Sequence, residues 1–78
     1  MEANEYLSQI GMNLFYFQHM HNSYPEAIFM SYPLFDMIAD SEKVVYYSDG
    51  RKRYCGVPIE TYRSDKLEYY FAVNKNEF

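Results

Sequence analysis

The stretch EAIFMSYPLFDMI, residues 26–38, joins a short apolar run directly to a helix start signal. Residues 26–30 are typical of a short buried strand. Ser31 can cap a following helix, and Pro33 falls in its first turn, where a missing N–H leaves no hydrogen bond unmade. We therefore predict a strand that passes at once into a helix ending near Asp40.

A second, longer helix is predicted over residues 4–20, upstream of this stretch. One stripe follows the three- and four-residue spacing of an amphipathic helix: Leu7, Ile10, Leu14, Phe17 and His21. Other large apolar residues lie off the stripe, so the helix is apolar on more than one face and we expect burial on two sides. Asn4 is the predicted N-cap, and the helix should end near Asn22-Ser23, before the next proline restricts the backbone.

Downstream, the pattern predicts a hairpin and a final strand. Residues 44–47 form the first strand, and Asp49-Gly50 is a hairpin turn signal. The return strand is expected over residues 51–55. Its continuation through Pro58–Glu60 would place that stretch at a sheet edge or a bulge, because proline donates no hydrogen bond. Residues 67–73 form the last predicted strand.

The predicted order of elements is helix, strand, helix, hairpin, strand. We assign it to the α+β class, as a small single domain over residues 1–78 with a mainly antiparallel sheet and two helices on one face. A core of this size gives limited stability, and a single cysteine allows no internal disulfide. Because small domains are commonly supplemented by a second subunit, we predict a homo-oligomer.

Charge is divided unequally along the chain. The first 42 residues contain six carboxylates and no lysine or arginine, whereas the rest contains seven basic and five acidic residues. The two parts carry charges of −6 and +2, which give the net charge of −4. This asymmetry describes what the surface attracts rather than the fold. Together with an aromatic content of 21%, it favours a basic or apolar macromolecular partner.

The residues expected to bind a protein partner come from the acidic half and from two tyrosine pairs. Neighbours on a strand face opposite sides, so Tyr46-Tyr47 and Tyr69-Tyr70 each present one outward ring, as a contact patch or as a crowded, solvated sheet face. Two aspartates four residues apart share a helix face, which a solvated surface also explains. The predicted binding residues are Glu26, Asp36, Asp40, Phe15, Tyr16, Tyr47 and Tyr70. Of these, Phe15 and Tyr16 are the predicted self-association surface.

An alternative function is carried by the one basic cluster of the sequence. Arginine and lysine interleaved with tyrosine can hold single-stranded nucleic acid by phosphate contact and base stacking. The residues for this role are Arg51, Lys52, Arg53, Tyr54 and Arg63. The same charges on a hairpin strand can instead protect a sheet edge from pairing with another chain. The net charge of −4 favours this second explanation.

Other function classes find little support in the sequence. It contains no glycine-rich phosphate motif, and Cys55, expected as a half-buried strand residue, lies in no catalytic or redox motif. His19 and His21 lack the further ligands that a zinc site needs. We therefore expect no enzyme activity, no cofactor and no metal. No apolar run is long enough to span a membrane and the N-terminus is acidic, so we expect no membrane segment, no signal peptide and a cytoplasmic location.

Three segments resemble a pattern found in tailed-phage proteins: Ile28–Ser31, Asp49-Gly50 and Gly56–Ile59. In major capsid proteins of these phages, a strand similar to the first segment leads a helix, and a DG turn precedes a strand similar to the third. Small phage proteins show a similar succession. The resemblance implies a phage or prophage origin, a bacterial host and the small α+β module, but no shell-building role, since capsid subunits are several times longer. We thus expect a non-enzymatic protein that self-associates and binds or inhibits a host macromolecule, such as a basic host protein.

Overall fold

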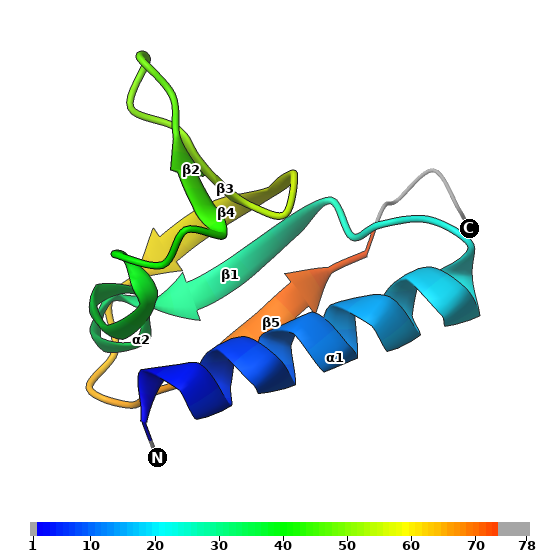
Figure 1. Ribbon diagram of the computed structural model, residues 1–78, viewed down its shortest axis with the longest axis horizontal. Coiled ribbons are helices and arrows are strands. Elements are labelled where there is room, and N and C mark those ends of the chain that lie inside the picture. The colour runs from blue at the N-terminus through cyan, green and yellow to red at the C-terminus, as the bar shows by residue number, and fades with distance from the viewer. Residues whose placement is uncertain (1, 74–78) are drawn as a thin grey trace.

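The computed structural model describes residues 2–73, which form two helices and a five-stranded sheet (Figure 1). In chain order the elements are α1 (Ala3–His21), β1 (Ala27–Ser31), α2 (Tyr32–Ile38), β2 (Val44–Tyr46), β3 (Lys52–Tyr54), β4 (Val57–Tyr62) and β5 (Tyr69–Ala72). The strands lie in the order β2-β3-β4-β1-β5. This confirms the α+β class predicted from the sequence.

The sheet is mixed because β1 and β4 run parallel. Ile28 lies opposite Ile59 in that pair, and on the other side of β1 the antiparallel β5 places Tyr70 opposite Phe29. The β2–β3 and β3–β4 pairs are also antiparallel. The sheet is therefore mainly antiparallel, as predicted, with a parallel pair that the sequence pattern did not reveal. Parallel neighbours need a crossover connection, which α2 and the β2–β3 hairpin supply.

Both helices cover the same face of the sheet, as predicted, and the core lies between the two layers. Side chains alternate along β1, so Ile28 and Met30 face the helices while Phe29 faces the other way. The buried residues of this core are Ile10, Leu14, Ile28, Met30, Leu34, Ile38, Val44, Tyr54, Val57 and Ile59. The opposite face of the sheet is covered by neither α1 nor α2 (Figure 1).

Helix α1 begins one residue earlier than predicted and has a different cap. Glu2 is the N-cap, and the Glu5 carboxylate accepts the backbone N–H of Glu2 at 3.5 Å. Asn4 lies inside the first turn, so the prediction that Asn4 caps the helix is wrong. At the other end Asn22 is the C-cap with a left-handed φ of +56°, and the helix stops where the sequence indicated.

Ser31 fixes the junction between β1 and α2. Its hydroxyl oxygen accepts the backbone N–H of Leu34 at 3.4 Å, which confirms the predicted cap, and also the N–H of Glu68 at 3.3 Å. The Ser31 N–H donates to the Glu68 carbonyl at 3.0 Å. This fully buried residue therefore ties together the end of β1, the start of α2 and the segment before β5.

The Asp49-Gly50 signal forms the predicted hairpin between β2 and β3. The Gly50 N–H donates to the Tyr47 carbonyl at 3.0 Å, and the Tyr47 N–H donates to the Arg51 carbonyl at 2.8 Å. Gly50 has a φ of +89°. A type I turn followed by a left-handed residue has this pattern, and glycine adopts that backbone without strain.

The predicted continuation of the return strand is wrong, because the chain reverses at Cys55-Gly56. Their φ angles of +49° and +86° match a two-residue type I′ turn. Cys55 is therefore an exposed turn residue rather than a half-buried strand residue. The reversal also makes β4 an interior strand. Pro58 lies opposite Arg53 beside the turn, and the register of β4 with β1 begins at Ile59, so Pro58 does not require an edge.

Tyr54 attaches β3 to α1 through the core. Its side chain is fully buried, and its hydroxyl donates to the Leu7 carbonyl at 3.2 Å. A Cβ atom at Gly11 would lie 3.4 Å from that hydroxyl, so glycine permits a close approach of the ring to the helix. Burial raises the pKa of Tyr54 above its usual value, with smaller contributions from Cys55 and Tyr69.

Replacing Tyr54 with phenylalanine keeps the ring in the core and removes the hydroxyl. We expect the free energy of unfolding to fall by about 1 kcal/mol, the usual effect of a lost hydrogen bond, in urea titrations followed by circular dichroism. Stability should also fall as pH rises above 10.0, the ordinary tyrosine pKa, because the unfolded chain loses the proton that folded Tyr54 keeps. Tyr54→Phe should lose less stability over this range, and an equal alkaline loss in both proteins would contradict the role of Tyr54.

Replacing Cys55 with asparagine should stabilise the fold by about 0.5–1 kcal/mol, because asparagine tolerates the left-handed backbone of a type I′ turn better than cysteine does. Cys55→Val is the matched variant, and its branched side chain should lower the free energy of unfolding at the same position. The same urea titration measures both. An asparagine variant less stable than the parent, with valine neutral, would contradict the turn assignment.

Candidate interaction surfaces

The solvent face of α1 carries four large apolar side chains, which we call the α1 band. Met12, Phe15, Tyr16 and Met20 are 59%, 66%, 57% and 77% exposed. Helical spacing places them away from the buried stripe of the same helix, in one band along its C-terminal half. Within one copy of the chain, α1 is thus buried on one side, and the predicted burial on two sides is not reached.

The rings of the α1 band contact each other and a histidine. Phe15 and Tyr16 meet edge to face with centroids 6.1 Å apart, and His19 stacks on Phe15 at 6.4 Å with an interplanar angle of 7°. Side chains that are already packed lose less rotamer freedom when a partner covers them. A contiguous apolar surface on a soluble domain is typical of an interaction site. The two residues predicted for self-association, Phe15 and Tyr16, both lie in this band.

The second surface is the sheet face that the helices leave open. It carries three rings, Phe29, Tyr62 and Tyr70, which we call the aromatic cluster. Phe29 and Tyr70 stack with centroids 5.1 Å apart and an interplanar angle of 8°, and Tyr62 lies 6.0 Å from Tyr70. Desolvation, followed by the charges of Glu68 and Tyr70, raises the pKa of Tyr62. Tyr70 remains 55% exposed, so the cluster is open to a ligand.

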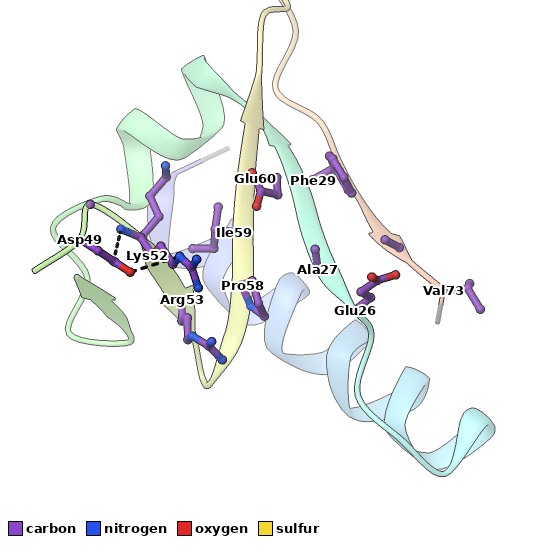
Figure 2. A pocket seen from close by; sticks show the side chains of 13 residues that line it. Glu26, Ala27, Phe29, Asp49, Lys52, Arg53, Pro58, Ile59, Glu60 and Val73 are labelled. Atoms are coloured by element: carbon purple, nitrogen blue, oxygen red, sulfur yellow. Dashed lines mark hydrogen bonds and ion pairs between the residues drawn. The ribbon is translucent and has the colours of Figure 1, made fainter. Parts of the chain in front are cut away.

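A groove of about 880 Å³ lies beside the aromatic cluster on the same sheet face (Figure 2). Arg53 lies on one side of it, on the β2–β3 hairpin, while Pro58 and Glu60 of β4 lie between that wall and β1. Glu26 and Val73 lie on the far side. One wall of the groove therefore carries three basic residues and Asp49, whereas Glu60 and Glu26 are the carboxylates of the rest of the lining.

The residues predicted for nucleic-acid binding do not share one surface. Arg51, Lys52 and Arg53 all line the groove, although the Lys52 ammonium lies 5.1 Å from the centre of the Phe35 ring of α2. Tyr54 is fully buried and cannot stack on a base, so its prediction as a contact residue is wrong. Arg63 follows the end of β4 and does not line the groove. Alternation along β3 is the physical reason for this division.

The two arginines of the groove are held by local contacts. Arg51 Nε lies 3.2 Å from Asp49 Oδ2. Arg53 Nη1 donates to the Gly56 carbonyl at 3.1 Å, and its guanidinium lies 5.6 Å from the centre of the Tyr47 ring. These contacts agree with the explanation in which the two arginines stabilise the hairpin and protect the sheet edge.

The acidic residues predicted to meet a partner are divided between two places. Glu26 precedes β1, whereas Asp36 lies in α2 at the other end of that strand. Five extended residues separate the ends of β1 by roughly 17 Å, so the three acids form no single acidic face. Helix α2 ends at Ile38, so Asp40 lies beyond it, and the predicted helix face shared with Asp36 does not exist.

The tyrosine pairs behave differently from each other. Tyr69 faces α1, where its hydroxyl accepts from the Asn13 amide at 2.6 Å and donates to Gln9 Oε1 at 3.3 Å. Tyr70 faces outward, as predicted. The pair Tyr46-Tyr47 is exposed at both residues, because β2 is an edge strand that ends at Tyr46. Tyr47 and Tyr70 therefore form no common patch.

Phe29 and Tyr62 belong to this surface but are not among the residues predicted from the sequence. Phe29 lies in an apolar run that is typical of a buried strand, and such a run gives no sign of its outward position. Tyr62 lies in a segment that no predicted strand includes. The period-two pattern of Val57 and Ile59 inward, with Glu60 and Tyr62 outward, is the signal that could have revealed it.

Across residues 2–73, the chain offers no helix long and apolar enough to cross a membrane, and no group of three potential metal ligands. Comparisons with protein-family models, curated proteins and solved structures found no match for the chain. Its function is therefore inferred from the α1 band and the open sheet face.

Proposed function

We propose that this is a non-enzymatic interaction protein that self-associates through the α1 band and presents its open sheet face to a macromolecular partner. The exposure of Met12, Phe15, Tyr16 and Met20, between 57% and 77%, carries the proposal. The resemblance to tailed-phage proteins adds a phage or prophage origin and a partner in the cytoplasm of a bacterial host. In this proposal the protein inhibits that partner by covering a basic surface on it.

The amount of apolar surface in the α1 band suits a symmetric pair. Full burial of one such side chain contributes about 1.5–3 kcal/mol, and association costs about 4–15 kcal/mol in lost freedom. A single copy of the band would barely offset that cost. Two copies that cover each other double the gain, and a two-fold axis brings the same patch of both chains together.

The charges on α1 also permit two copies to meet. From Ser8 to Asn22 the sequence contains no carboxylate, lysine or arginine, so the band lies on a helix face without permanent charge. The acidic residues of the helix, Glu2 and Glu5, lie in and next to its first turn, away from the band. Like-charge repulsion between two bands is therefore small.

Single-stranded nucleic-acid binding is supported less well. That function needs exposed basic and aromatic groups on one path. Tyr54 is buried, and Arg51 and Arg53 already have partners within the hairpin.

A glutamate placed in the α1 band should separate the copies. Phe15→Glu and Tyr16→Glu each put a carboxylate where an apolar interface excludes water, which is costly for an unpaired charge. We expect sedimentation equilibrium to show an oligomer for the parent protein in the micromolar range and a monomer for both variants. Far-UV circular dichroism should not change, since neither side chain belongs to the core.

Tyr32→Glu is the matched control for these variants. Tyr32 is 51% exposed and lies at the start of α2, so the same chemical change falls outside the α1 band. It should leave the oligomer intact. A parent protein that sediments as a monomer, or a control that dissociates as fully as Phe15→Glu, would overturn the proposal.

A further inference from the structure

The open sheet face places a carboxylate among the rings of the aromatic cluster. Glu60 is the register partner of Phe29 in the parallel β1–β4 pair and lies two residues before Tyr62 on the same face of β4. Phe29 in turn lies opposite Tyr70. Adjacent strands are about 4.8 Å apart, so Glu60 and the three rings form one continuous surface. Figure 2 shows Glu60 and Phe29 on neighbouring strands beside the groove.

Glu60 is available to a ligand. It is exposed, and its carboxylate has no ion pair and no hydrogen bond with residues 2–73. Arg51 across the groove pairs with Asp49, while Lys52 and Arg53 keep their charge but form no ion pair with Glu60. The lining holds three basic and three acidic residues, and within it Glu60 is a carboxylate without an ion pair, with Glu26 at the far wall.

Rings and a carboxylate together select a cation. An aromatic face attracts positive charge within about 6 Å of its centre, and a carboxylate attracts the same group. A lysine or arginine side chain satisfies both, because its apolar stem can lie along the rings while its charged end reaches Glu60. Glu68, whose charge acts on Tyr62, strengthens the negative potential. A phosphate would meet repulsion from Glu60 at this position.

We propose that the open sheet face binds an extended segment of a partner protein through a lysine or arginine side chain, which lies over the aromatic cluster and pairs with Glu60. The adjacent groove receives the residues on either side of that basic residue. This inference rests on the proposed function, because it names the chemistry of the partner. The site itself does not require an oligomer, since the α1 band lies on the other side of the sheet.

Fluorescence anisotropy with three labelled probes tests this site: the peptide (Gly-Lys)4, the peptide (Gly-Glu)4 and a single-stranded oligothymidylate. We expect the lysine peptide alone to bind. Glu60→Gln and Tyr70→Leu should each weaken its binding at least about fivefold, the effect of losing one carboxylate contact or one ring under a cation. Both side chains are exposed, so far-UV circular dichroism should confirm an intact fold.

Glu42→Gln is the matched control, because it removes the same charge from an exposed position between α2 and β2. It should change the affinity less than twofold. Equal weakening by Glu42→Gln and Glu60→Gln would show only a long-range attraction and overturn the proposal. Preferential binding of the glutamate peptide or of the oligothymidylate would overturn it too, as would no lysine-peptide binding at millimolar concentration. Phe15→Glu should bind the lysine peptide as the parent does, which separates failure of this site from failure of self-association.

Discussion

The position of β1 in the middle of the sheet is the constraint on which the other elements depend. β1 pairs on both sides, in parallel with β4 and antiparallel with β5. At its end, Ser31 holds the start of α2 and the segment before β5 through hydrogen bonds of its hydroxyl and its N–H. Alternation along β1 then divides the molecule, because Ile28 and Met30 face the helices and Phe29 faces away.

This division leaves two surfaces of different chemistry on opposite sides of the molecule. The two helices cover one face of the sheet, so the other face stays open. Helix α1 also carries apolar side chains on its solvent face. The α1 band has no permanent charge, which suits another apolar surface and therefore a second copy. The open sheet face combines three rings with Glu60, which suits a cation. Each surface can be occupied without the other, so the proposed self-association and the proposed partner binding would not compete.

Local signals in the sequence were sufficient for the helices and the first hairpin. The stripe through Ile10 and Leu14, the cap at Ser31 and the turn at Asp49-Gly50 each depend on residues close together in the chain. The turn at Cys55-Gly56 had no such signal, because cysteine is not among the residues that favour positive φ. Missing that reversal hid the alternation of β4 and the position of Tyr62. The parallel β1–β4 pair joins residues about thirty apart, and no local pattern encodes it. For the same reason the meeting of Phe29 with Glu60 could not be predicted, whereas the position of Phe15 and Tyr16 off the buried stripe and the outward direction of Tyr70 could.

The most direct test of the central position of β1 is a set of backbone nuclear Overhauser effects in isotopically labelled protein. The structure predicts contacts from Ile28–Ser31 to Ile59–Tyr62 in a parallel pattern, and from Ala27–Met30 to Tyr69–Ala72 in an antiparallel pattern. Both sets must be present in the same sample. Contacts that place β1 at a sheet edge, or that pair it with β4 in the antiparallel sense, would contradict the fold and separate Phe29 from Glu60.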